Sequence, residues 1–302
     1  MKQLAILIII IFSILVSTLY AQEKYPLKQL TFDPAQEGFP SWSQDCKTIV
    51  YTHIVREDSS RMTGLWKVSA DGGKPWQFTD LIGEHPDWSP DGHYIVFDAD
   101  SGNSIKLVSS QGGKPIRIVP ETIPVFRGGN PCWSPDGSQI AFKGSANLYL
   151  LDVQTGKFRN IFHEEGKLPI PCCWSLDGKY IYVNLRSTKS QESTLWKIST
   201  AGEKIQQLTF KEENFYRYMD LSPDGSLLAI VSKESGNFDI WIMPAEGGNP
   251  IQLTFHPAMD DTPRWSPDGK KIAFTSTRSD NFEVWVMELD IEKLKQELKS
   301  VK

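Results

Sequence analysis

The sequence lacks most of the motifs by which a catalytic or metal site is recognised. No Gly-x-Ser-x-Gly stretch marks the nucleophile of a serine hydrolase, and no glycine-rich loop of the phosphate-cradling kind is present. Cys-x-x-Cys and Cys/His ligand spacings are missing as well, and the 302 residues contain only five histidines. No cofactor is therefore expected, and the sequence directs attention to binding surfaces.

Clusters of basic residues are missing too. Lys and Arg number 32 against 37 Asp and Glu, which gives a net charge of −5, and both signs are scattered along the chain. A protein that neutralises a phosphate backbone needs a basic patch or stripe, so nucleic acid is not expected as a partner. The hydrophobic content of 40% is ordinary for a globular protein with one large core or two smaller ones.

Cysteine is scarce, with four residues at positions 46, 132, 172 and 173. Their spacing does not demand disulfides, and the adjacent Cys172 and Cys173 could bond each other only through a strained ring. Buried free thiols are the favoured interpretation. Pairing stays open, because an exported protein meets an oxidising compartment.

The N-terminus carries a long apolar run from Leu4 to Val16, preceded by Lys2 and followed by small or polar residues up to Ala21. This order is typical of a signal peptide, so residues 1–21 are predicted to direct export. Leu19 lies where a small residue is preferred, and the run approaches the roughly 20 residues that span a bilayer, so an uncleaved anchor is the alternative. Either outcome makes the protein periplasmic or secreted, with a membrane contact through this segment alone.

One phrase recurs along the rest of the chain. It reads DWSPDGHYIVF at 87–97, CWSPDGSQIAF at 132–142 and RWSPDGKKIAF at 264–274. Its Trp position returns after 41 to 47 residues each time. The six members are Trp42, Trp88, Trp133, Trp174, Leu221 and Trp265. A period of about 40 to 50 residues built from short alternating strands is typical of propeller blades.

Each repeat contains four strand segments: one ends at the Trp position, two follow the Ser-Pro-Asp-Gly turn, and the outermost follows a Gly-bearing turn. The segment at 28–32 precedes the first repeat, while the sixth repeat has no outer strand of its own. The sequence thus predicts an all-β, six-bladed propeller with four-stranded antiparallel blades over residues 22–290, its last blade closed by the N-terminal strand. Residues 291–302 are predicted to form a short helical tail.

The Trp-Ser-Pro-Asp-Gly phrase, the Ile-Ala-Phe strand and the Gln-Leu-Thr outer strand together resemble the repeat of the TolB-type, WD40-like propeller family. The resemblance implies an exported, non-catalytic scaffold that binds proteins in the cell envelope. The α/β domain that precedes the blades in TolB has no counterpart in this sequence, which leaves the Tol-specific role open. Similar repeats occur in propellers of peptidases and pectate-type lyases, so a channel-site lyase or hydrolase acting on a polysaccharide or peptide is the alternative.

The residue just before each Trp position varies while the rest of the repeat does not. Asp87, Asp220 and Arg264 bring charge to this position near the axis, where Arg264 could pair with either carboxylate. The loops that enter the inner strands add aromatic and arginine side chains, which is the composition of interface anchors. These loop residues are Phe126, Arg127, Phe215, Tyr216, Arg217 and Tyr218. Together the two groups are predicted to bind a protein or an envelope component, with the chain acting as a monomer; packing of single rings onto the blades is the alternative.

Histidine offers little for a metal site. His85 lies near the start of an inner strand beside Glu84 and Asp87, so it could contribute to a cation site at the channel mouth. One imidazole with carboxylates more often forms part of an ordinary polar surface at a channel opening than a metal site. No metal is therefore assigned, and Glu84 and His85 are the candidates if one binds.

Overall fold

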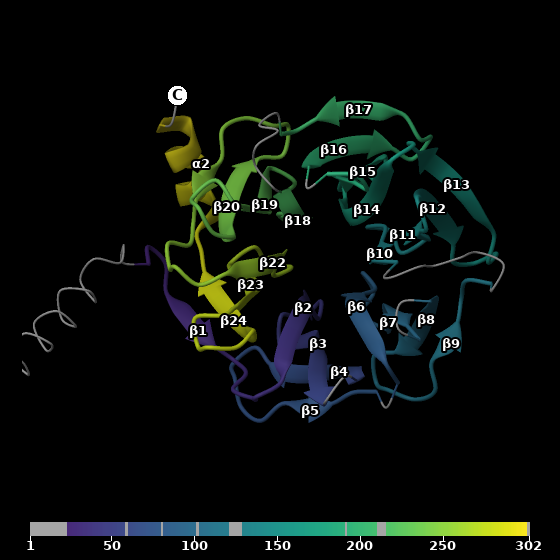
Figure 1. Ribbon diagram of the computed structural model, residues 1–302, viewed down its shortest axis with the longest axis horizontal. Helices are drawn as coiled ribbons and strands as arrows, with labels where there is room; N and C mark the ends of the chain where they lie inside the picture. The colour runs from purple at the N-terminus through teal and green to yellow at the C-terminus, as the bar shows by residue number, and fades with distance from the viewer. Residues whose placement is uncertain are drawn as a thin grey trace, which may run out of the picture.

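A computed structural model of the protein describes residues 23–300 apart from 58–59, 80, 101–102, 121–128, 191 and 210–215. Figure 1 shows six small sheets arranged as blades around a central axis. Each sheet is four-stranded and antiparallel, so the predicted six-bladed propeller is confirmed. The segment predicted to direct export, residues 1–21, lies outside the described residues.

The blades follow one another along the chain, and each of the first five runs from its innermost to its outermost strand. Blade 1 contains β2 (Gln36–Trp42), β3 (Thr48–Glu57), β4 (Ser60–Ser69) and β5 (Trp76–Gln77). Blade 2 contains β6 (Gly83–Trp88), β7 (Tyr94–Ala99), β8 (Ser104–Ser109) and β9 (Ile116–Arg117). Blade 3 contains β10 (Cys132–Trp133), β11 (Gln139–Gly144), β12 (Asn147–Asp152) and β13 (Phe158–His163).

The second half of the ring repeats this order. Blade 4 contains β14 (Lys167–Trp174), β15 (Tyr180–Ser187), β16 (Ser193–Ser199) and β17 (Lys204–Gln207). Blade 5 contains β18 (Tyr216–Leu221), β19 (Leu227–Ser232), β20 (Asp239–Pro244) and β21 (Ile251–Gln252). Blade 6 contains β22 (Asp260–Trp265), β23 (Lys271–Ser276), β24 (Glu283–Glu288) and, as its outer strand, β1 (Leu27–Gln29).

The N-terminal strand closes the ring. Leu27 pairs with Met287 and Gln29 with Trp285 in antiparallel register, and Figure 1 shows β1 alongside β24. The contact continues past β1, because Leu30 N–H donates to the Val284 carbonyl at 2.8 Å. Closure of the last blade by the N-terminal strand is therefore confirmed.

The Gln-Leu-Thr phrase explains why the outer strands are short, as in β1, which ends at Gln29 although its predicted segment runs to residue 32. In blade 4 the Thr209 hydroxyl accepts from Leu195 N–H at 3.0 Å, and the Gln207 side-chain amide donates to the Thr209 carbonyl at 2.7 Å. Thr254 and Gln252 make the same two bonds in blade 5. A threonine side chain thus replaces the backbone partner, and regular pairing ends at the glutamine.

The Ser-Pro-Asp-Gly turn is held by its own side chains. Ser89 Oγ donates to Asp91 Oδ1 at 2.5 Å and accepts from Tyr94 N–H at 2.9 Å, while Gly92 takes a φ of 74°. A left-handed φ is readily adopted by glycine, which has no Cβ to clash. Cys46 fills this place in the imperfect first copy, with a φ of 59°, so that turn is strained.

Hydrophobic clusters fill the spaces between neighbouring blades. Trp42 and Tyr51 of blade 1 pack with Val284 of blade 6, and Trp174 of blade 4 packs with Leu148 of blade 3. Each buried Trp ring contributes at least about 1.5 to 3 kcal/mol of transfer free energy. The repeated Trp is therefore a structural part of the blade interface.

The predicted C-terminal helix is present as α2 (Ile291–Ser300). Asp290 Oδ1 caps it by accepting from Glu292 N–H at 2.9 Å. Leu294 is buried in the cluster between blades 5 and 6, so the helix packs against the ring. In the described part of the chain, no helix is both long and apolar enough to traverse a bilayer.

Candidate binding site

The inner strands share an irregularity at the third residue before the Trp position. The register shifts of β2, β6 and β22 fall there, and four blades carry a residue with positive φ at this position. These residues are Phe39 (52°), His85 (50°), Asn130 (46°) and Thr262 (51°). Such a backbone is unfavourable for a β-branched residue like Thr262, and bulges re-aim side chains that a regular strand would alternate between its two faces.

The six residues at this position, one from each blade, line a single cavity at one mouth of the channel. They are Phe39, His85, Asn130, Pro171, Tyr218 and Thr262. The residues that follow them also line the cavity, and four are proline, so the rim has little conformational freedom to lose on binding. The cavity volume is about 50 Å³, whereas a small-molecule pocket usually offers roughly 300 Å³ or more. We call this cavity and its rim the channel mouth.

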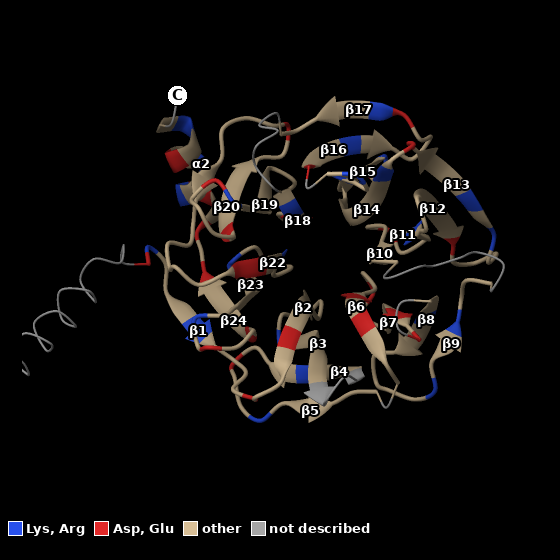
Figure 2. Cartoon of the chain, viewed as in Figure 1, with Lys and Arg blue, Asp and Glu red and all other residues tan. Residues whose placement is uncertain are grey.

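A partly buried charge layer lies at the floor of the channel mouth. Arg264 Nη2 contacts Asp87 Oδ1 at 2.6 Å, and Arg264 Nη1 contacts Asp220 Oδ1 at 3.5 Å. The predicted pairing of Arg264 is thus found with both carboxylates. Figure 2 shows that acidic residues also lie on the inner strands β2, β6 and β22. The other oxygen of Asp87 accepts from Trp133 N–H at 2.9 Å, and that of Asp220 from Trp265 N–H at 2.7 Å.

These hydrogen bonds show that the layer also joins neighbouring blades. Each of these carboxylates reaches the backbone of the following blade, and Ser41 Oγ does the same by accepting from Trp88 N–H at 3.3 Å. Burial raises the pKa of Asp220 to about 6, although Arg264 lowers it. Burial also raises the pKa of Asp87, against the lowering effect of Arg264. Arg264 therefore keeps the two carboxylates charged in a site that would otherwise favour their neutral forms.

His85 is engaged within the channel mouth. Its Nδ1 lies 2.7 Å from Asp98 Oδ2, and its ring lies 3.9 Å from that of Phe39. Phe39 in turn meets Tyr218 edge-on at 5.4 Å. Three blades thus contribute rings to one aromatic group, in which Asp98 orients His85.

The predicted loop residues fall into three groups. Phe126, Arg127 and Phe215 lie outside the described residues. Tyr216 is 3% exposed and packs into the core, as the alternative interpretation held. Tyr218 lines the channel mouth, whereas Arg217 lines a separate small cavity to which Tyr218 also contributes. Arg217 Nη1 contacts Asp261 Oδ2 at 2.7 Å, and its guanidinium lies 4.6 Å from the ring of Phe238.

Three of the four cysteines lie on the inner strands β10 and β14. Cys132, Cys172 and Cys173 are buried, and Cys46 is partly exposed. Burial raises the pKa of the Cys172 thiol to about 11. The buried thiols therefore remain protonated at neutral pH and act as small apolar side chains.

The opposite end of the channel is a wider funnel of about 330 Å³. The five tryptophans and Leu221 of the repeat line it, together with turn residues such as Pro90 and Leu176. Trp42 Nε1 donates to the Arg264 carbonyl at 3.1 Å, across the interface between blades 6 and 1. This end is therefore built largely from the structural parts of the repeat.

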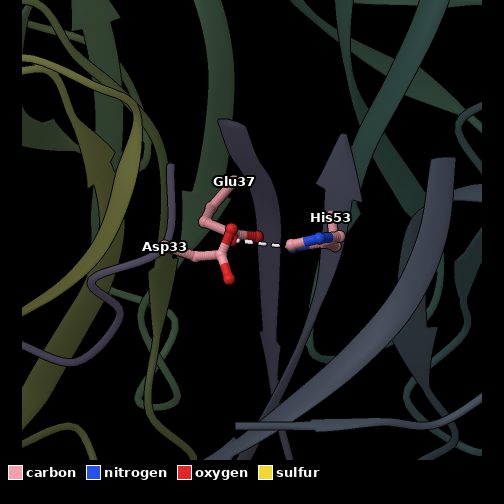
Figure 3. Close-up of side chains that lie close together, drawn as sticks. All are labelled: Asp33, Glu37 and His53. Carbon is pink, nitrogen blue, oxygen red and sulfur yellow. Dashed lines mark hydrogen bonds and ion pairs between the residues drawn. The ribbon is translucent and has the colours of Figure 1, made fainter. Parts of the chain in front are cut away.

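Sequence analysis missed two groups of residues. Phe39, Asn130 and Thr262 were overlooked although they share one offset from the Trp position, and comparing that column across repeats would have found them. Asp33, Glu37 and His53 were overlooked as well. Within the described ranges these three form a group of side chains close enough to share a metal ion, and Figure 3 shows the Glu37 carboxylate between Asp33 and His53. Glu84 and His85, the metal candidates from the sequence, do not belong to that group.

The fold and the channel mouth define a six-bladed propeller with an aromatic, proline-rich opening above the charge layer. Residues 217–298 match the model of the TolB beta propeller domain. With the six repeated blades, this match supports the resemblance of the chain to the TolB-type β-propeller family.

Individual relatives support the same family. The Tol-Pal system protein TolB of Anaeromyxobacter dehalogenans (strain 2CP-C) is 34% identical over 123 residues, which cover 41% of this chain and 27% of that protein. The structure of TolB from Acinetobacter baumannii has a TM-score of 0.61 at 20% identity, over 82% of this chain and 65% of that one. Oligogalacturonate lyase from Vibrio parahaemolyticus has a TM-score of 0.61 at 12% identity, over 90% and 95%. These structural likenesses concern the fold alone.

Proposed function

We propose that the protein is an exported, non-catalytic propeller that binds a protein component of the cell envelope through its channel mouth. The observation that carries the proposal is the convergence of one residue from each of the six blades on this opening. Phe39 and Tyr218 offer rigid aromatic surface at the channel mouth, and the partly exposed side chain of Arg217 lies next to Tyr218, in a neighbouring small cavity that Tyr218 also lines. Aromatic and arginine side chains around an apolar centre are typical of interface hot spots.

The size of the channel mouth favours a protein partner over a small substrate. A cavity of about 50 Å³ holds a few water molecules, so a sugar chain would have to displace the rim. A protein segment can instead cover the rim and place one side chain in the opening. The similarity to oligogalacturonate lyase concerns the fold alone, so we do not extend that activity to this chain.

Mature protein immobilised as bait tests the proposal. Wild-type bait is expected to retain an envelope protein after chemical cross-linking, and bait with Arg217→Ala and Tyr218→Ala is expected to lose it. Matched control bait carries Gln44→Ala and Leu176→Ala, which alter the opposite end of the channel, and should retain the partner. Equal retention by all three baits would contradict binding at the channel mouth. Circular dichroism and thermal melting of each bait show whether the fold is intact.

We also propose that residues 1–21 direct export and that the mature chain is a monomer. The order of charge, apolar run and small residues supports the first proposal. Mass spectrometry of the protein from the periplasmic fraction is expected to find a chain that begins at Gln22. A chain that keeps Met1 and sediments with membranes would indicate an uncleaved anchor. Gel filtration of the mature chain measures its oligomeric state and so tests the proposal of a monomer.

A further inference from the structure

The group formed by Asp33, Glu37 and His53 lies away from the channel mouth. Asp33 is on the link between β1 and β2, Glu37 is on β2, and His53 is on β3. Glu37 and His53 are direct register partners across the two strands, and Glu37 Oε1 lies 2.9 Å from His53 Nδ1. One ligand atom from each of the three residues lies within 4.8 Å of the others, and Figure 3 shows the three side chains grouped together.

A buried carboxylate oxygen in this group lacks a protein partner. The Glu37 side chain is 0% exposed, and within the described part of the chain its Oε2 has no hydrogen-bond donor. A buried acceptor without a donor costs about 1 to 3 kcal/mol, and more when it is charged. Glu37 therefore either holds a proton or faces a cation.

The surroundings of Glu37 are acidic. Ligand atoms of Asp33 and Glu37 lie within 4.8 Å of each other, and Glu37 N–H donates to the carbonyl of Phe282, the residue before the buried Glu283. Three carboxylates therefore lie near this group, and a neutral His53, as a metal ligand must be, offsets none of their charge. A divalent ion would balance two of these charges.

The equivalent carboxylate in blade 6 is neutralised differently. Asp260 stands five residues before Trp265, as Glu37 stands five before Trp42. Asp260 Oδ2 contacts Arg278 Nη2 at 2.8 Å, so a permanent cation belongs to that site. In blade 1 the corresponding partner is a histidine, which is itself a metal ligand when neutral.

The donor set and its spacing suit a transition-metal ion. One imidazole with carboxylates is a ligand combination that Zn²⁺ and other divalent first-row transition metals bind. Ligand atoms at about 2.1 Å from a tetrahedral ion lie roughly 3.4 Å apart. The Glu37 Oε1–His53 Nδ1 distance of 2.9 Å is shorter than this, and all three ligand atoms lie within 4.8 Å of one another. Gly64 is the register partner of His53 on β4, so no side chain at that position crowds the imidazole.

We propose that Asp33, Glu37 and His53 bind one divalent ion of the Zn²⁺ class, with water completing the coordination. The ion would enter from the side of Asp33, which is exposed. It would link the segment that follows the closing strand β1 to blade 1. That segment is already held by Asn281, whose side-chain amide donates to the Asp33 carbonyl at 3.0 Å, so the ion would reinforce the seam of the ring.

Calorimetric titration of the chelator-stripped, purified protein with Zn²⁺ tests the site. We expect one ion per chain, and a weakening of at least about tenfold for Asp33→Asn, Glu37→Gln and His53→Gln. Asp33→Asn is decisive if the buried variants fail to fold, because the Asp33 side chain is exposed. Zn²⁺ should also raise the melting temperature of the wild type.

Two control variants separate this site from other ligands. Asp71→Asn removes an exposed carboxylate with the same change of charge, and His163→Gln removes an exposed histidine on blade 3. Both should bind Zn²⁺ as the wild type does. The Co²⁺ complex should lack a thiolate charge-transfer band, which would appear if the buried cysteines were the ligands. No saturable binding, a thiolate band, or wild-type affinity in Asp33→Asn would overturn the proposal.

Discussion

The charge layer of the channel gives a prediction whose size can be worked out from the structure. Arg264→Met keeps most of the side-chain volume but removes the cation that faces Asp87 and Asp220. The Arg264 side chain is 21% exposed, and those of the two aspartates 16% and 15%. At an effective dielectric constant of about 20, unit charges 4 Å apart interact with roughly 4 kcal/mol. Allowing for partial solvent access, we expect a loss of about 3 kcal/mol at pH 7.5.

The loss should depend on pH in a definite direction. The pKa of Asp220 is about 6 in the native protein, above the ordinary 3.8. A carboxyl whose native pKa is raised contributes stability that is present below the unfolded pKa and is lost as the pH rises through the native pKa. Removing Arg264 raises that native pKa further. The variant should therefore lose less stability relative to wild type at pH 5 than at pH 7.5.

Urea unfolding followed by tryptophan fluorescence measures the free energy of unfolding at both pH values. In thermal unfolding at pH 7.5, the melting temperature should fall by about 6 °C, at roughly 2 °C per kcal/mol for a chain of this size. Adding Asp87→Asn and Asp220→Asn to Arg264→Met should restore most of the stability, because no unpaired charge remains and the amide oxygens can still accept from the backbone. An equal loss at both pH values, or no recovery in the triple variant, would refute the reasoning.

Three further substitutions test the blades themselves. Gly202→Ala should lower the free energy of unfolding by at least about 3 kcal/mol, because φ is +94° and a Cβ would lie 1.8 Å from the Ile161 carbonyl oxygen. Gly156→Ala should lower it by about 1 kcal/mol in the same urea titration, because φ is +66° and the space around the new Cβ is open. Burial lowers the pKa of Lys67 to about 8 from 10.5, so the wild type should gain up to about 3 kcal/mol relative to Lys67→Met between pH 8 and 10.5. A parallel pH dependence in the two proteins would contradict that assignment.

The fold could be predicted because the same pattern of strands and turns recurs six times in the sequence. Trp42, Trp174 and their equivalents mark where each inner strand ends, and the offset of the segment at 28–32 predicts the closure that β1 makes. The lengths of the outer strands were overestimated, since hydrophobicity alone does not show that the Thr209 hydroxyl takes over a backbone bond. Local pattern thus located the strands better than it located their ends.

The candidate site was predicted only in part. Asp87, Asp220 and Arg264 were found because the residue before the Trp position varies while the rest of the repeat does not, and the ring brings these three positions together near the axis. Phe39 and Thr262 have no chemistry in common and are related only by position and by a bulge that the sequence does not reveal. His53 reaches Glu37 through strand register, which a single sequence leaves undetermined.

The pairing of β1 with β24 sets an order on folding. Five blades can form from neighbouring stretches of chain, whereas the sixth needs two strands from opposite ends of the sequence, and such distant contacts form slowly. Until they meet, β24 presents an unpaired edge, and the matching strand of a second molecule fits it equally well. High concentration during refolding therefore favours strand-exchanged dimers, and dilution favours closed monomers.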